Sequence, residues 1–139
     1  MVAGDIPGVT LSGAGDPEHR HGVLLVEDDY DTREAFVTIL ETLGLTVVGA
    51  ANGREALERL WGGLRPCLII LDIAMPEMDG YAFRRAQLAD PTLTGIPVAV
   101  MSGAGWAVER DARALGLTTF LRKPIDPDQL LATLGDCVA

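Results

Sequence analysis

The sequence lacks any apolar run near the length that crosses a membrane, and it contains only two cysteines in 139 residues. A membrane-spanning helix needs about 20 apolar residues, and residues 1–15 lack the basic segment and compact apolar stretch of a secretory signal. We therefore expect a cytoplasmic protein that makes no membrane contact. Cys67 and Cys137 form no CxxC motif and have no histidine nearby. They suggest neither redox chemistry nor a zinc site, and Cys67 is expected to be a small core residue.

Positive charge is also scarce in this chain. It has 11 lysine and arginine residues against 20 aspartate and glutamate residues, which gives a formal net charge of −9 at pH 7. This excess of negative charge disfavours binding to nucleic acids and anionic membranes, whereas a basic partner surface would be attracted. Apolar residues make up 48% of the chain, enough for one hydrophobic core without disulfides or metal ions to stabilise it.

Five short apolar runs follow a glycine-rich start. Residues 1–21 show neither helical nor strand periodicity, so we expect a flexible extension there and one folded domain over residues 22–139. The runs are apolar throughout rather than alternating, which is typical of strands in a sheet that is covered on both faces. They are Val23–Val26, Thr46–Ala50, Cys67–Leu71, Ile96–Met101 and Thr118–Leu121.

Helical periodicity fills the gaps between these runs. Gly44 and Gly116 are expected to end two of the helices. Strands that alternate with helices predict an α/β fold, a (βα)5 doubly wound five-stranded parallel sheet. The residues expected on the inner faces of the helices are Ala35, Phe36, Ile39, Leu40, Leu43, Ala56, Leu57, Leu60, Tyr81, Phe83, Leu88, Val108, Ala112, Leu115, Leu130, Leu131, Leu134 and Val138.

Charged and polar residues stand at the ends of four strands. In such folds the carboxyl ends of the parallel strands meet at one edge of the sheet, and ligands bind there. Apolar or turn residues would have been the ordinary finding at these positions. The residues expected at this edge are Glu27, Asp28, Asp29, Asp72, Ser102 and Lys123.

These residue types suit a magnesium site beside a nucleophile. Mg²⁺ prefers oxygen ligands, and a bound cation relieves the repulsion between close carboxylates. Once the metal and Lys123 neutralise an incoming phosphoryl group, the Asp72 carboxylate can attack phosphorus and form an acyl phosphate. The Ser102 hydroxyl can then bond to the new group and bias a two-state loop. Taken singly, each residue has an ordinary interpretation, such as a helix cap at Asp28 or Asp29, so the prediction rests on their combination.

Four segments carry recognisable motifs: Val23–Asp29, Leu71–Gly80, Val98–Gly103 and Phe120–Pro124. The second matches Asp-x-x-Met-Pro-x-Met-Asp-Gly, which has no common structural alternative. In this order the four segments resemble the response-regulator receiver domains of two-component signalling, over residues 22 to about 138. The resemblance implies a flavodoxin-like sheet with the strand order 2-1-3-4-5.

The resemblance also implies a role for each matching residue. Asp72 is the expected phosphorylation site. Asp28 is expected to bind Mg²⁺ directly, and Glu27 to reach the metal mainly through water. The backbone carbonyl of Ala74 would be a further ligand, and Lys123 would pair with the phosphoryl group.

Four further residues have expected roles in capping or switching. Ser102 would be the switch hydroxyl, and Phe120 the aromatic residue whose rotamer follows it. Asp29 is expected to cap a helix, and Gly80 to shape the loop after the phosphorylation site through a positive φ. Serine and phenylalanine stand where threonine and tyrosine are more frequent in the family, which leaves the strength of the switch open.

Other classes of protein fit the sequence less well. A nucleotide binder with this fold would need a glycine-rich phosphate loop in place of Glu27–Asp29, and no GxxxxGK[ST] motif is present. A phosphatase with an aspartyl nucleophile would typically carry a second acid at Ala74, which argues against independent hydrolase activity. We expect a signalling phospho-acceptor that is not an enzyme and that promotes only its own phosphorylation and dephosphorylation. Two alternatives stay open: a receiver-like interaction module that is not phosphorylated, and a receiver domain excised from a hybrid histidine kinase. Met1 and the short extension favour a complete protein.

The resemblance finally implies partners. A histidine kinase or a phosphotransfer protein would act upstream. The downstream target would be an unknown protein that contacts the face made by the last strand and the last two helices. We expect no nucleic acid or membrane partner, and a monomer or weak homodimer.

Overall fold

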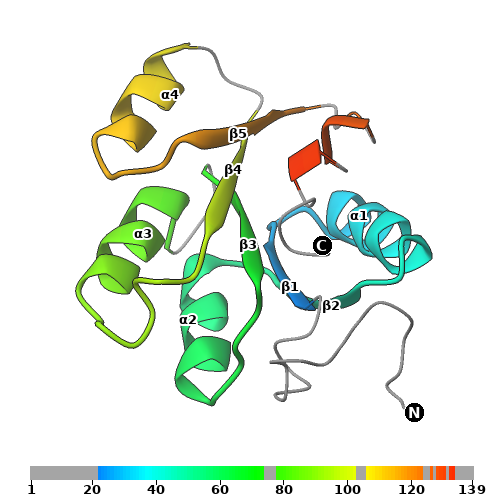
Figure 1. The fold of residues 1–139 in the computed structure, drawn as a ribbon, viewed down its shortest axis with the longest axis horizontal. Coiled ribbons are helices and arrows are strands. Elements are labelled where there is room, and N and C mark those ends of the chain that lie inside the picture. The colour runs from blue at the N-terminus through cyan, green and yellow to red at the C-terminus, as the bar shows by residue number, and fades with distance from the viewer. Residues whose placement is uncertain are drawn as a thin grey trace.

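A computed structural model of the chain describes residues 22–73, 78–102, 106–123, 126, 128–130 and 132–133, with the backbone alone at 106–108. Strands and helices alternate along this part of the chain (Figure 1). The elements are β1 (Gly22–Val26), α1 (Tyr30–Thr42), β2 (Thr46–Ala50), α2 (Gly53–Trp61), β3 (Leu68–Asp72), α3 (Gly80–Leu88), β4 (Val98–Ser102), α4 (Trp106–Arg113) and β5 (Thr119–Arg122).

The strands form one parallel sheet of five strands in the order β2-β1-β3-β4-β5. The predicted flavodoxin-like topology is therefore confirmed. β1 and β3 lie side by side near the centre, and all five residues of each are buried. Their carboxyl ends consequently open at the same edge of the sheet.

Both faces of the sheet are covered, because successive strand residues point to opposite sides. Val23 and Leu25 of β1 pack in one cluster with Phe36 and Leu40 of α1. The alternate residues Leu24 and Val26 pack in a second cluster with α2 and α3, which lie together on one side of the sheet (Figure 1). This arrangement explains why the sequence of each central strand is continuously apolar.

Local signals in the sequence set where several helices begin and end. Asn52 caps α2, its side chain accepting a hydrogen bond from the backbone N–H of Glu55 at 2.8 Å. Gly44 and Gly116 follow α1 and α4 with φ of 90° and 80°, a conformation that glycine adopts at little cost. Both predicted helix ends are confirmed.

Burial on the helix surfaces differs from the prediction at four residues. Phe36 of α1 is buried, but Ala35 on the same helix is exposed, Ile39 and Leu43 are 39% and 40% exposed, and Leu88 of α3 is 43% exposed. The predicted burial of these last four is wrong. These residues lie at the edge of the apolar stripe of their helix. A periodic sequence pattern does not show which residues at that edge are buried.

Cys67 also differs from the prediction. It is half-buried and disulfide-bonded, so the expectation of a small core residue is wrong, and the sequence analysis did not predict the disulfide. The other cysteine of the sequence, Cys137, lies outside the described residues.

Two further predictions fall partly or wholly outside the described residues. Residues 1–21, expected to be a flexible extension, are not described. The last predicted helix is seen at 128–130 and 132–133, where Leu130 is fully buried in the cluster with α1. Within the described part of the chain, no helix is both long enough and apolar enough to span a membrane.

Candidate functional site

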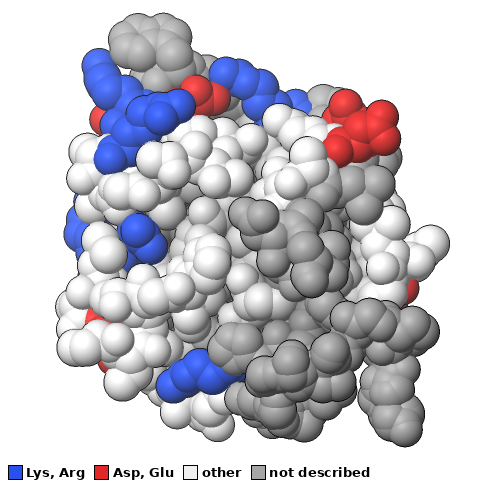
Figure 2. All heavy atoms as spheres, viewed as in Figure 1, with Lys and Arg blue, Asp and Glu red and all other residues white. Residues whose placement is uncertain are grey.

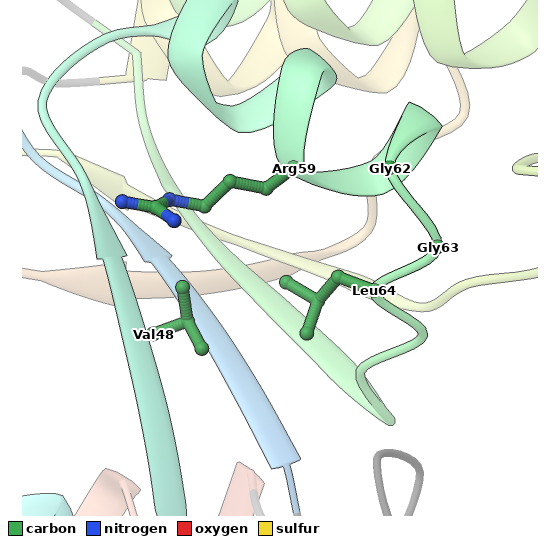
Figure 3. A pocket seen from close by; sticks show the side chains of 5 residues that line it. All are labelled: Val48, Arg59, Gly62, Gly63 and Leu64. Atoms are coloured by element: carbon green, nitrogen blue, oxygen red, sulfur yellow. The ribbon is translucent and has the colours of Figure 1, made fainter.

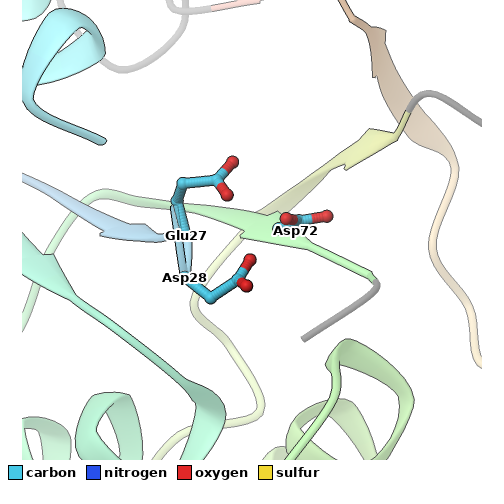
Figure 4. Close-up of side chains that lie close together, drawn as sticks. All are labelled: Glu27, Asp28 and Asp72. Carbon is cyan, nitrogen blue, oxygen red and sulfur yellow. The ribbon is translucent and has the colours of Figure 1, made fainter. Parts of the chain in front are cut away.

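Three carboxylates converge at the carboxyl edge of the sheet. Glu27 and Asp28 follow β1, and Asp72 is the last residue of β3. One carboxylate oxygen from each lies within 4.8 Å of the others. Figure 4 shows the side chains of Glu27 and Asp28 pointing toward Asp72. Glu27 and Asp72 are 1% and 4% exposed, whereas Asp28 is open to solvent.

The ammonium of Lys123, just after β5, lies between the two buried acids. Its Nζ is 3.0 Å from Glu27 Oε1 and 3.2 Å from Asp72 Oδ2. The backbone N–H of Lys123 donates to the carbonyl of Ser102 at 3.1 Å, which extends the pairing of β4 and β5 by one residue. The structure therefore brings together the acids and the lysine that the sequence placed at separate strand ends.

Lys123 is expected to titrate above its ordinary range. Burial alone would lower the pKa of its ammonium, but the Glu27 and Asp72 carboxylates outweigh burial and raise that pKa above the usual 10.5. Because the pKa is higher in the folded state, the ion pairs stabilise the fold fully below pH 10.5 and lose this effect as pH rises through the folded pKa. Lys123 is the only lysine in the sequence, so ¹³C-lysine labelling gives a single NMR titration.

The titration has a built-in reference. The same labelled chain in concentrated urea gives the pKa of Lys123 without its partners. A folded midpoint at or below the unfolded one would contradict the ion pairs with Glu27 and Asp72.

Asp29 acts as a helix cap, as predicted. Its Oδ2 accepts hydrogen bonds from the backbone N–H and the hydroxyl of Thr32, at 2.9 and 2.6 Å. The hydroxyl bond, followed by the backbone bond, lowers the pKa of the Asp29 carboxyl. Its backbone N–H in turn donates to Glu27 Oε2 at 3.1 Å. Asp29 thus caps the start of α1, and its backbone N–H also orients the carboxylate of Glu27.

Gly80 matters for a different reason than predicted. The positive φ angles of described glycines belong to Gly44, Gly63 and Gly116, so the expected positive φ at Gly80 is wrong. A Cβ at Gly80 would instead lie 2.8 Å from the carbonyl oxygen of Asp72 and 2.8 Å from Cα of Ile73. The start of α3 is therefore pressed against the end of β3, and only glycine fits there.

The start of α2 also touches the segment that follows Asp72. The backbone N–H of Gly53 donates to the carbonyl of Met78 at 3.0 Å, and a Cβ at Gly53 would come within 2.8 Å of that oxygen. Ala74, whose carbonyl was predicted to bind Mg²⁺, lies in the undescribed stretch 74–77.

Ser102 lies on β4, the strand next to that of Asp72, and Phe120 lies on β5, one strand further out. Ser102 ends β4 and is 8% exposed. Phe120 of β5 is half-buried, and the guanidinium of Arg113 lies over its ring, 4.9 Å from the centroid. This contact joins α4 to β5 through the residue predicted to switch.

Figure 2 shows basic side chains, drawn in blue, gathered around α4. Each arginine of α4 and β5 has a nearby partner. Arg113 stacks on Phe120, Arg110 lies 3.6 Å from an Asp111 oxygen, and Arg122 lies 2.7 Å from a Glu109 oxygen. Neighbouring acids thus offset much of the positive charge on this face.

The carboxylate cluster suits a hard divalent cation. Mg²⁺ takes oxygen ligands, keeps several waters and is commonly held by one or two carboxylates together with phosphate oxygens. Glu27, Asp28 and Asp72 supply such oxygens close together, with Asp28 open to solvent on the approach side. The residues therefore fit a magnesium ion.

A second hollow lies away from these acids. Figure 3 shows it between β2 and the end of α2, lined by Val48, Arg59 and the loop from Gly62 to Leu64. Among the lining residues that the structure describes, Arg59 is the charged one, and it lies 3.8 Å from a Glu55 carboxylate oxygen on the same helix. These described residues include no carboxylate for a metal and no nucleophile.

Sequence reasoning missed Arg33. Its Nη1 donates to the backbone carbonyl of Glu27 at 2.8 Å, from the first turns of α1. No motif distinguishes this arginine from a solvated one. The sequence signal that could have identified Arg33 is its position, five residues after Asp28 on a helix that begins at the site.

A parallel flavodoxin-like sheet with an acid cluster and a lysine at its carboxyl edge defines the class of receiver folds. The chain belongs to the response regulator receiver domain family, whose family model matches residues 23–135. Receiver domains are signalling modules of two-component systems.

Relatives of known sequence agree with this family. The chain is 37% identical over 119 residues to response regulator Rre1 of Synechocystis, covering 84% of this chain and 51% of Rre1. It is 33% identical over 130 residues to the hybrid signal transduction protein dokA of Dictyostelium discoideum, covering 93% of this chain and 8% of that protein. The chain thus spans about half of one relative and a small part of the other.

Solved structures share the fold. The chemotaxis protein CheY4 of Vibrio cholerae aligns with a TM-score of 0.76 at 32% identity, covering 84% of this chain and 97% of CheY4. The receiver domain of a histidine kinase from Syntrophus aciditrophicus aligns with a TM-score of 0.75 at 35% identity, covering 85% and 89% of the two chains.

Proposed function

We propose that Asp72 accepts a phosphoryl group from a histidine kinase or a phosphotransfer protein, with Mg²⁺ held by the neighbouring acids. One observation carries this proposal. In a chain of the receiver family, Asp72 stands at the end of β3, within reach of two further carboxylates and the Lys123 ammonium. The alternative of an interaction module that is not phosphorylated is disfavoured, because the full set of acids and the lysine is present.

Each residue would contribute a distinct step. An Asp72 carboxylate oxygen attacks phosphorus while the bond from phosphorus to the donor breaks, and the donor leaves with that electron pair. Lys123, which pairs with Asp72 before transfer, would then pair with the phosphoryl oxygens. Its raised pKa keeps the ammonium charged at neutral pH.

The acids would divide the work of holding the metal. Asp28 and Asp72 would bind Mg²⁺ directly, as would the backbone carbonyl of Ala74. Glu27, whose carboxylate is already engaged by Lys123 and by the N–H of Asp29, would act mainly through water. The bound ion would neutralise charge on the transferring phosphoryl group.

The switch would pass through Ser102 and Phe120. A phosphoryl group on Asp72 gives the Ser102 hydroxyl an acceptor that exists only in the modified state, so the bond can shift a two-state equilibrium. Phe120 would follow and alter the α4 and β5 face through its contact with Arg113. A downstream protein would recognise that face.

Incubation with Mg²⁺ and the small phosphodonor acetyl phosphate tests the proposal. Intact mass measurement in acid should show the addition of one phosphoryl group that is lost in base. The Asp72→Ala variant should show none. No addition to the native chain, or an unchanged addition to the variant, would refute the proposal.

A further inference from the structure

Three polar groups of Glu27 form hydrogen bonds, and its fourth, the carboxylate oxygen Oε1, forms an ion pair. Its backbone N–H donates to the carbonyl of Ala50 at 3.0 Å. Its two carboxylate oxygens face the Asp29 N–H and the Lys123 ammonium. Its carbonyl accepts from Arg33 Nη1 at 2.8 Å, a short bond from a charged donor.

The bond from Arg33 bears on Asp28 directly. The Glu27 carbonyl belongs to the peptide unit that joins Glu27 to Asp28, and a peptide unit is planar. Fixing its oxygen therefore fixes the direction in which the chain leaves β1. That direction sets where the exposed Asp28 carboxylate stands relative to Asp72 (Figure 4).

Arg33 is itself held in place on two sides. Its stem crosses β2 at Gly49, where an added Cβ would lie 3.2 Å from Cδ and 3.6 Å from Cγ of Arg33. Its guanidinium lies 5.5 Å from the centroid of the Tyr30 ring. Gly49 thus leaves the space that the arginine stem occupies, and the contacts of the stem and of the guanidinium favour one orientation of the half-buried Arg33.

We propose that Arg33 is a positioning residue for the acidic site, which holds the 27–28 peptide so that Asp28 can bind the cation together with Asp72. The inference rests on the proposed magnesium site. Charge alone predicts the opposite effect, because a nearby guanidinium repels a cation and its removal should tighten Mg²⁺ binding. Positioning predicts that its removal weakens binding.

Positioning and charge predict opposite changes in Mg²⁺ affinity, so calorimetric titration of Mg²⁺ into the full chain distinguishes them. Arg33→Met should weaken binding about tenfold to a hundredfold, the range seen when groups that orient metal ligands are removed. Arg33→Lys should recover part of the loss. Gly49→Ala, which displaces the stem without changing any charge, should also weaken binding.

Two controls separate positioning from folding and from general charge. Arg54→Met removes an exposed arginine of α2, paired with Glu58 at 3.5 Å, and should leave Mg²⁺ binding close to that of the native chain. Circular dichroism without metal identifies the temperature at which every variant is folded. Equal or tighter binding by Arg33→Met would overturn the inference while leaving the proposed function intact. Absence of Mg²⁺ binding by the native chain would overturn both.

Discussion

A Gly80→Ala variant is expected to lose about 1–3 kcal/mol of unfolding free energy, the usual cost of forcing an extra methyl group into a packed site. The new Cβ would meet the carbonyl oxygen of Asp72 and the Cα of Ile73, both at 2.8 Å. These are backbone atoms, so no side chain can rotate away. The clash would also shift the end of β3, which carries Asp72.

Gly95→Ala provides the matched control. Nothing lies within 4 Å of a Cβ at Gly95. Both substitutions restrict the unfolded chain to a similar extent, so the difference between them isolates the contact at Gly80. Urea denaturation of the two variants gives this difference, and equal unfolding free energies would contradict the close approach of α3 to β3.

Lys123→Met is expected to slow phosphoryl uptake from acetyl phosphate about a hundredfold to a thousandfold, the usual cost of removing one group that stabilises transition-state charge. Its Mg²⁺ affinity should stay the same or rise. The ammonium lies 3.0 Å from Glu27 and 3.2 Å from Asp72, where it opposes a second cation. The variant therefore separates metal binding from transfer. A titration with Mg²⁺ gives the affinity, and the uptake rates of the variant and the native chain are compared at saturating Mg²⁺.

Arg122→Met is the control for charge at this end of β5. It removes one positive charge from the adjacent residue, whose guanidinium faces Glu109 at 2.7 Å rather than the acidic site. Its uptake rate should match that of the native chain. Equal slowing in both variants would show that net charge, and not the position of Lys123, governs the rate.

The fold could be predicted because its determinants are local and repeated. Continuous apolar runs such as those of β1 and β3 require cover on both faces. Helix caps such as Asn52, and glycine ends such as Gly44, mark the boundaries between elements. The strand order came from the resemblance to a family, since no local signal states which strands are neighbours.

The acids and the lysine of the site could be predicted because the sequence indicates where each strand ends. Contacts that depend on how closely two segments pack could not be predicted. Examples are the close approach of Gly80 to the backbone of β3 and the hydrogen bond from Arg33 to Glu27. The hydrogen bonds from buried Gln87 to the carbonyls of Leu93 and Ile96 are another. Such contacts follow from packing of the whole domain, which residue patterns do not specify.

Chemical trapping of the phosphorylated chain tests the central claim most directly. Borohydride reduces an acyl phosphate of aspartate to homoserine, and sequencing of the peptides by mass spectrometry then locates the modified residue. After incubation with Mg²⁺ and acetyl phosphate, homoserine should be found at position 72 and at no other acid of the site. Homoserine at position 28, or none in a chain that binds Mg²⁺, would contradict Asp72 as the acceptor.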